Sequence, residues 1–206
     1  MTTAQSERAQ LSDLLDEVGP DAPTLCGEWD ARQLAAHLVL RERRPDAAPG
    51  ILVGPLSGWT ARVQRGIAAA EWPALVEQVR SGPPVWSPFR LLDRVANAAE
   101  YLVHHEDVRR AAAGWEPREL PGAVQDEVWR LVKGVSRLGY RSSPVGVRLR
   151  RPGGAVVSAK RGERTVTLAG EPLELLLHAF GRDAVRVEPE GEASDVAALM
   201  ALERGF

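Results

Sequence analysis

Apolar residues recur every three or four positions from the N-terminus to about Tyr140, which is the spacing of amphipathic helices. Leu11, Leu15 and Val18 follow this period before Gly19 ends the first segment. Further helices are expected at 31–43, 56–70, 73–80, 89–113 and 123–138. The pattern predicts a bundle of helices for this part of the chain.

The second of these helices has the clearest start signal in the sequence. Asp30 is a favourable N-cap, and Gln33 three residues later completes a capping box. Trp29 and Leu34 occupy the positions of a hydrophobic staple on either side of the cap. These four residues predict a helix that begins at Ala31.

The period changes after residue 142. Val145, Val147 and Leu149 alternate with small or charged residues, which is typical of a half-buried strand, and Gly153-Gly154 predicts a hairpin turn. Two more strands are expected at 155–160 and 164–168, then a helix at 170–180, a strand at 185–187 and a last helix capped by Ser194. The order β-β-β-α-β-α predicts an α+β fold with a helical domain at 1–142 and a small domain at 143–206.

Composition narrows the possible partners. The 206 residues carry 26 basic and 28 acidic side chains, a net charge of −2, so nothing indicates binding to nucleic acid or an anionic membrane. One cysteine cannot form an internal disulfide, the N-terminus is polar, and no apolar run reaches the roughly 20 residues of a membrane span. We expect a cytoplasmic protein with no membrane and no nucleic-acid partner.

Three side chains in the helical part could hold a cation. Glu100 and His104 lie four residues apart, hence on one helix face, and His37 falls on the apolar face of another helix. Two imidazoles and a carboxylate with open positions suit Zn²⁺ and also Fe²⁺. Asp107 is placed to accept the other N–H of His104 as an outer-sphere partner, whereas His105 points about 100° away.

Each of these residues also has an ordinary structural interpretation. A glutamate and a histidine four apart are common as a solvated pair, and a lone His37 among apolar residues is more often a core histidine. Cys26, the single thiol, is more typical of a small buried residue than of a nucleophile. His178, among leucines, is more typical of packing than of ligation. Spacing alone leaves these alternatives open.

A family resemblance adds to this interpretation. The segment 24–30, TLCGEWD, is followed by LAAH ending at His37, and later by Glu100-x-x-x-His104-x-x-Asp107. In order and separation these motifs resemble the metal-binding DinB-like four-helix family, and more narrowly its actinobacterial branch typified by mycothiol-dependent maleylpyruvate isomerase. Segment 170–182 is similar to part of that branch's small sterol-carrier-like domain, so the resemblance covers nearly the whole chain.

The resemblance implies a site and a chemistry. It implies that His37, Glu100 and His104 hold a divalent metal, usually zinc, which activates a low-molecular-weight thiol such as mycothiol as a thiolate. The activity implied is that of an isomerase or S-transferase acting on a small electrophile or acidic metabolite. Arg182 is similar in position to an arginine that helps bind the thiol or the substrate carboxylate, the alternative being a cation at a helix C-terminus.

Two other classes of function remain open at the level of sequence. One is a non-catalytic protein that binds a metal and a small ligand, and the other is a metal-dependent hydrolase with metal-bound water as nucleophile. A fold shared by many activities does not name a substrate, and the adjacent His104 and His105 leave the register of the site open.

Overall fold

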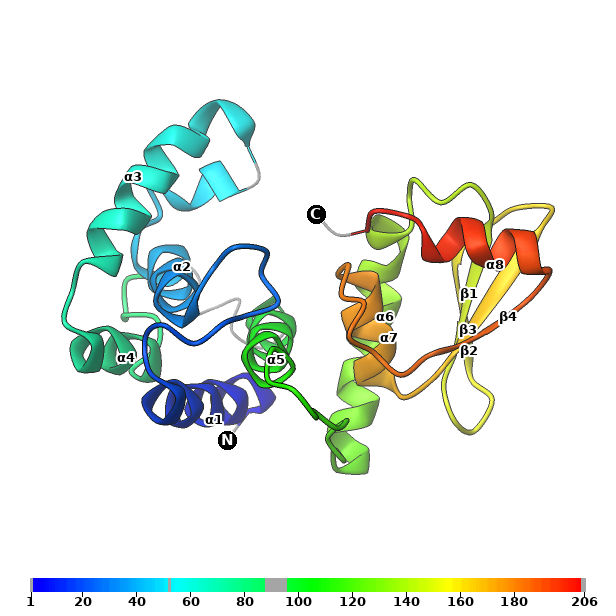
Figure 1. Cartoon of the computed structure of the whole chain (residues 1–206), viewed down its shortest axis with the longest axis horizontal. Helices are drawn as coiled ribbons and strands as arrows, with labels where there is room; N and C mark the ends of the chain where they lie inside the picture. The colour runs from blue at the N-terminus through cyan, green and yellow to red at the C-terminus, as the bar shows by residue number, and fades with distance from the viewer. Residues whose placement is uncertain (1, 52, 88–95, 205–206) are drawn as a thin grey trace. The chain divides into compact units, whose positions relative to one another are not determined.

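We describe the protein from a computed structural model, in which residues 2–51, 53–87 and 96–204 are described. The chain divides into two compact units, Met1–Trp115 and Glu116–Phe206. The N-terminal unit is helical and the C-terminal unit combines helices with a sheet (Figure 1). The mixed α and β content agrees with the α+β fold expected from the sequence.

The N-terminal unit is built from helices that share one apolar core. Helix α1 packs against α4 and α5, and α2 packs against α3 and α4. Leu11, Leu34, Leu75 and Tyr101, from four different helices, are fully buried together in this core. The elements are α1 (Thr3–Val18), α2 (Ala31–Arg43), the short 3-10 turns η1 (Ala48–Ile51) and η2 (Gly54–Leu56), α3 (Ser57–Ala68), α4 (Trp72–Arg80) and α5 (Ala96–Arg109).

The predicted start of α2 is confirmed in detail. The Asp30 side chain accepts a hydrogen bond from the backbone N–H of Gln33, and the Gln33 side chain accepts one from the backbone N–H of Asp30. Both donors would otherwise lack an intrahelical partner. This cap fixes where α2 begins and therefore which helix face carries His37. The first residues of the helix predicted at 89–113 lie outside the described residues.

Helix α5 is buried on almost every side. From Asn97 to Val108 each residue is buried except Glu100, which is partly buried. Charged side chains inside a protein need partners, and those of α5 have them: Glu106 accepts from Arg110 at 2.5 Å, and His105 lies 2.8 Å from Glu7 of α1. This helix therefore places several paired polar and charged side chains inside the unit.

The C-terminal unit carries a four-stranded sheet. Its strand order is β2-β1-β3-β4, with β1 and β3 parallel and the other neighbouring pairs antiparallel. The β-β-β-α-β-α order and the hairpin turn at Gly153-Gly154 agree with the prediction from sequence. The elements are α6 (Gly122–Gly139), β1 (Gly146–Arg150), β2 (Val156–Lys160), β3 (Thr165–Ala169), α7 (Pro172–Ala179), β4 (Glu188–Glu190) and α8 (Ala193–Met200).

Helix α6 belongs to the C-terminal unit, although the sequence grouped residues 1–142 as one helical domain. It packs along the fully buried α7, and the two helices lie side by side in Figure 1. The backbones approach so closely that a Cβ atom at Gly139 would overlap the carbonyl oxygen of Ala179. The apolar face of α6 is thus covered by α7, and the units divide after Trp115.

Two local predictions in this unit were wrong. The fourth strand is Glu188–Glu190 instead of 185–187, because the backbone N–H of Arg186 donates to the Glu174 side chain at 2.7 Å. At the sheet edge β4 tolerates Pro189, which cannot donate a ladder hydrogen bond. The last helix is capped at Glu192, so Ser194 lies inside its first turn.

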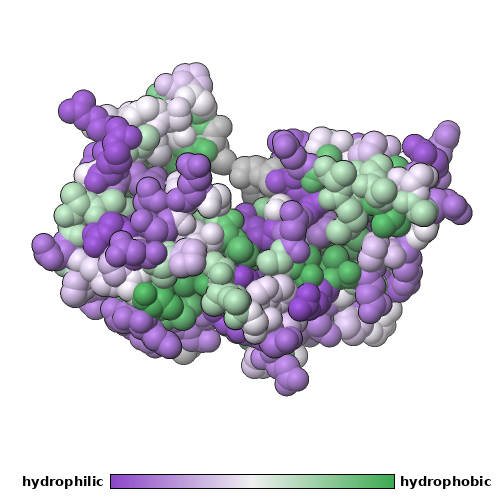
Figure 2. All heavy atoms as spheres, in the orientation of Figure 1, coloured by the Kyte–Doolittle hydropathy of each residue, from purple (hydrophilic) through white to green (hydrophobic). Residues whose placement is uncertain are grey.

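The visible surface mixes hydrophilic groups with smaller apolar areas (Figure 2). In the described part of the chain, no helix has the length and apolar character needed to cross a membrane.

Candidate metal centre

Two helices bring the three predicted side chains together. His37 projects from α2, and Glu100 and His104 lie one turn apart on α5. One carboxylate oxygen, Glu100 Oε1, lies 3.1 Å from His37 Nε2 and 3.2 Å from His104 Nε2. Both imidazoles are buried, and the Glu100 side chain is 19% exposed. Two imidazole nitrogens and one carboxylate oxygen therefore converge at a partly accessible point.

A second set of contacts lies on the other side of the His104 ring. His104 Nδ1 is 2.9 Å from Asp107 Oδ2, and the Cys26 thiol donates to the same oxygen at 3.0 Å. The Asp107 side chain is fully buried. Because Asp107 accepts from Nδ1–H, Nε2 is the nitrogen of His104 that can give up its proton to bind a cation, and it faces Glu100. Asp107 thus lies where the sequence placed an outer-sphere acceptor.

Three further side chains border the cluster and were not assigned to the site from the sequence. Arg41 Nε lies 3.7 Å from Glu100 Oε1, and Arg41 also donates to Asn97 at 2.5 Å. The Trp29 ring lies 5.2 Å from the ring of His37. Helical spacing could have identified two of them. Arg41 is four residues after His37 and Asn97 is three before Glu100, so each shares a helix face with a predicted ligand.

The electrostatics of the cluster are set by burial and by its carboxylates. Burial opposes ionisation of Glu100, but hydrogen bonds from His104 and His37 outweigh it and hold the Glu100 pKa well below its ordinary value. Burial likewise opposes the charged form of His104, yet Asp107, Cys26 and Glu100 raise its pKa well above the ordinary value. Burial dominates at His37 and lowers its pKa. One imidazole therefore favours the charged form and the other the neutral form.

The donor set fits a divalent transition metal. One ligand atom from each of His37, Glu100 and His104 can be chosen so that all three lie within 4.8 Å of one another. Two nitrogens and one oxygen suit Zn²⁺ or Fe²⁺, and three protein ligands leave positions for an exogenous molecule. Cys26, His104 and Asp107 satisfy the same distance criterion through Nδ1 of the shared imidazole. The described residues therefore offer two ligand groups that meet at His104.

The two adjacent histidines of α5 make different contacts. His104 contacts Glu100 and Asp107, whereas the buried Nδ1 atom of His105 lies 2.8 Å from Glu7 of α1. A step of one residue turns a helical side chain by about 100°, which explains the separation. His105 is a partner of α1 and does not join the cluster.

The C-terminal candidates lie in the other unit. Arg182 follows α7 and donates to the carbonyl of Phe180 at 2.8 Å, a contact suited to a cation beyond a helix C-terminus. His178 is fully buried, and its Nδ1 lies 2.5 Å from the hydroxyl of Tyr140. Burial and then the charge of Arg204 lower the pKa of His178 to about 3. These contacts agree with a packing role for His178.

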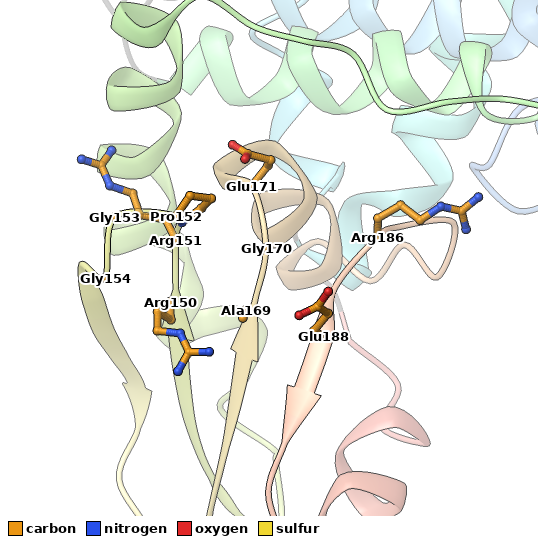
Figure 3. A pocket seen from close by; sticks show the side chains of 10 residues that line it. All are labelled: Arg150, Arg151, Pro152, Gly153, Gly154, Ala169, Gly170, Glu171, Arg186 and Glu188. Atoms are coloured by element: carbon orange, nitrogen blue, oxygen red, sulfur yellow. The ribbon is translucent and has the colours of Figure 1, made fainter.

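A surface hollow of about 460 Å³ opens at one end of the sheet in the C-terminal unit (Figure 3). It is lined by the ends of β1 and β3, by the turn that follows β1, and by Arg186 and the first residue of β4. Arg150 pairs with Glu190, Arg151 pairs with Asp126, and Arg186 extends away from the other lining side chains. Acidic partners already engage Arg150 and Arg151, which weakens the hollow as a site for an anion.

Comparison with known proteins relates the fold to that of a solved isomerase. The chain resembles the crystal structure of the mycothiol-dependent maleylpyruvate isomerase with a TM-score of 0.57 and 14% identity, covering 93% of this chain and 92% of that one. A mutant of that isomerase gives a TM-score of 0.55 and 13% identity over the same shares. No family model matches the chain, and no curated protein matches it significantly. At this identity the likeness establishes the fold.

Proposed function

We propose that this protein binds one divalent cation through His37, Glu100 and His104 and is a thiol-dependent isomerase or S-transferase. The observation that carries the proposal is the convergence of both imidazole Nε2 atoms on one oxygen of Glu100, at 3.1 and 3.2 Å. The fold likeness to mycothiol-dependent maleylpyruvate isomerase supports the same chemistry. Zinc is the proposed metal, and mycothiol the proposed thiol.

A divalent cation at this point supplies Lewis acidity that keeps a bound thiol deprotonated at neutral pH. The chain's own residues prepare the position. Asp107 holds the Nδ1 proton of His104 and so keeps Nε2 available as a ligand atom. The guanidinium of Arg41 adds a positive charge close to Glu100, which favours an anionic molecule at the open position.

The small molecule attacked by the thiolate is proposed as an electrophile or acidic metabolite. Arg182 is proposed to bind the thiol or the substrate carboxylate, since a guanidinium pairs well with a carboxylate. The helical unit is proposed to be DinB-like, and the C-terminal unit sterol-carrier-like. These assignments rest on the sequence motifs together with the fold likeness.

The first test is metal content measured by elemental mass spectrometry on protein purified without a metal-binding tag. We expect about one divalent ion per chain, and its loss in His37→Ala, Glu100→Ala and His104→Ala with the helical circular dichroism retained. Protein that stays metal-free after reconstitution with Zn²⁺, or variants that keep the wild-type metal content, would refute the site.

The second test separates the three function classes. Mycothiol added to the cobalt-substituted protein should change its visible spectrum if an open coordination position is present. A thiol-dependent enzyme isomerises maleylpyruvate, or adds thiol to another electrophile, only with thiol present. A hydrolase would instead be inhibited by thiol, and a purely binding protein would turn over in neither condition.

A further inference from the structure

We infer that Cys26 is a positioning residue of the metal centre, acting through Asp107 on His104. The inference rests on the proposed function, because it assigns a second layer to the same site. A side chain two hydrogen bonds away from a ligand atom influences metal affinity by fixing the orientation and tautomer of the ligand.

The loop between α1 and α2 delivers Cys26 to α5 by a set of backbone contacts. The backbone N–H of Leu25 donates to the backbone carbonyl of Asp107 at 3.0 Å. This bond joins the loop to α5 at Asp107, the residue that contacts both Cys26 and His104. Thr24 tightens the turn, because its hydroxyl donates to Trp29 O and accepts from the Cys26 N–H. Gly27 has a φ of +62°, a conformation that favours glycine. The position of the thiol is therefore built into the loop.

The thiol contacts the least exposed member of the cluster. The Asp107 side chain is fully buried, and its Oδ2 atom accepts from Cys26 Sγ at 3.0 Å and lies 2.9 Å from His104 Nδ1. The sulfur lies 3.5 Å from Nδ1 itself. A carboxylate oxygen with two donors converging on it has fewer orientations than one with a single donor. Cys26 thereby holds Asp107 against the imidazole.

The contact between Cys26 and Asp107 also affects Nε2 of His104, on the other side of the ring. While Asp107 accepts from Nδ1–H, the proton that a cation can displace from His104 is the one on Nε2, the nitrogen that faces Glu100. Without the thiol, Asp107 loses one of the donors that fix it, and the imidazole tautomer becomes less strictly defined. Affinity for a cation bound through Nε2 then falls.

Co²⁺ titration of the wild-type protein and of Cys26→Ala and Cys26→Ser tests this role. We expect Cys26→Ala to raise the Kd for Co²⁺ about tenfold, the lower end of the range for outer-sphere changes. Cys26→Ser retains a donor and should stay within a few-fold of wild type, which makes it the conservative rescue. Glu7→Gln is the matched control and should leave the Kd unchanged. It alters the buried partner of His105, which is the neighbour of His104 on α5 but contacts α1 instead of the cluster.

Two spectroscopic results decide between positioning and direct ligation. Nitrogen-15 NMR of the wild-type protein should show His104 protonated at Nδ1 in the zinc form, with a shifted resonance in Cys26→Ala. A sulfur-to-cobalt charge-transfer band that disappears in Cys26→Ser would make Cys26 a ligand and overturn the positioning role. A Cys26→Ala Kd equal to wild type would also overturn it while leaving the proposed function intact. Wild-type protein that binds no Co²⁺ would refute both.

Discussion

Each unit buries histidine, yet His104 and His178 face opposite surroundings. Around His104, Glu100 and Asp107 lie within 3.2 Å of the two ring nitrogens, and its pKa is raised. Around His178, the Tyr140 hydroxyl contacts Nδ1, the buried Nε2 atom has no hydrogen-bond partner among the described residues, and the pKa falls to about 3.

The comparison of His104 with His178 indicates which surroundings suit a buried histidine to binding a metal. Burial alone disfavours the charged imidazole and leaves a neutral packing residue, as at His178. Carboxylates on both nitrogens offset that cost and orient the ring toward a cation, as at His104. The carboxylates, and not the depth of burial, mark the metal-binding candidate.

The largest effect on metal binding is expected when the imidazole of His104 is removed. We expect His104→Ala to abolish stoichiometric metal binding, because one of three ligands is lost and Glu100 keeps only His37. Elemental mass spectrometry measures the metal content per chain. His105→Ala is the control and should keep the metal, since His105 pairs with Glu7. Loss of metal in both variants would point to a general disruption of α5.

The second prediction concerns acid stability of the C-terminal unit. The folded pKa of His178 is about 3 against an ordinary 6.5, so the unfolded chain binds more protons between these values. Stability is full above about pH 6.5 and declines as pH falls toward 3, by up to a few kcal/mol at about 1.4 kcal/mol per pKa unit.

Urea unfolding followed by circular dichroism at pH 4 to 8 measures this slope. His178→Phe should flatten it, because the only histidine of this unit is removed. Burial raises the pKa of the neighbouring Tyr140, so its hydroxyl stays protonated throughout this range. An unchanged slope in the variant would show that other groups carry the acid sensitivity.

The third prediction tests whether the charge of Asp107 supports metal binding. Asp107→Asn keeps the shape of the side chain but removes its charge, so it should weaken metal affinity about 10- to 100-fold, or about 1.4 to 2.8 kcal/mol. Isothermal titration with Zn²⁺ in competition with a chelator measures the change. Equal affinity in Asp107→Asn and wild type would mean that the Nδ1 contact does not support ligation.

The smallest effect is expected at the other histidine of α5. Glu7→Gln leaves His105 with a neutral partner in a buried position, which should lower the free energy of unfolding by about 1 to 2 kcal/mol. Metal content should not change. Urea unfolding and elemental mass spectrometry on the same sample test both statements, and a loss of metal would mean that α1 supports the site.

Much of this arrangement was readable from local sequence. The capping box of Asp30 and Gln33 fixed the start of α2, and the four-residue spacing of Glu100 and His104 set one face of α5. Both rest on contacts within a single helical turn. Hydrophobic periodicity also predicted α6, but it could not show that α7 covers its apolar face.

The contacts missed from sequence are those between segments distant along the chain. Cys26 lies 78 residues before His104, and their approach depends on where the loop crosses α5. The fourth strand was misplaced for the same reason, because the Glu174 side chain holds the backbone of Arg186. Alternation at 185–187 carried no information about that contact.

The close approach at Gly139 has a consequence for how this sequence can vary. Any side chain there would collide with the backbone of Ala179, which cannot move aside as a flexible side chain can. Gly134, on the same helix, has open space around its missing Cβ. In a saturation library screened for folded protein, position 139 should retain only glycine while position 134 accepts many residues. Residue 139 therefore acts as a steric gatekeeper for the pairing of α6 with α7.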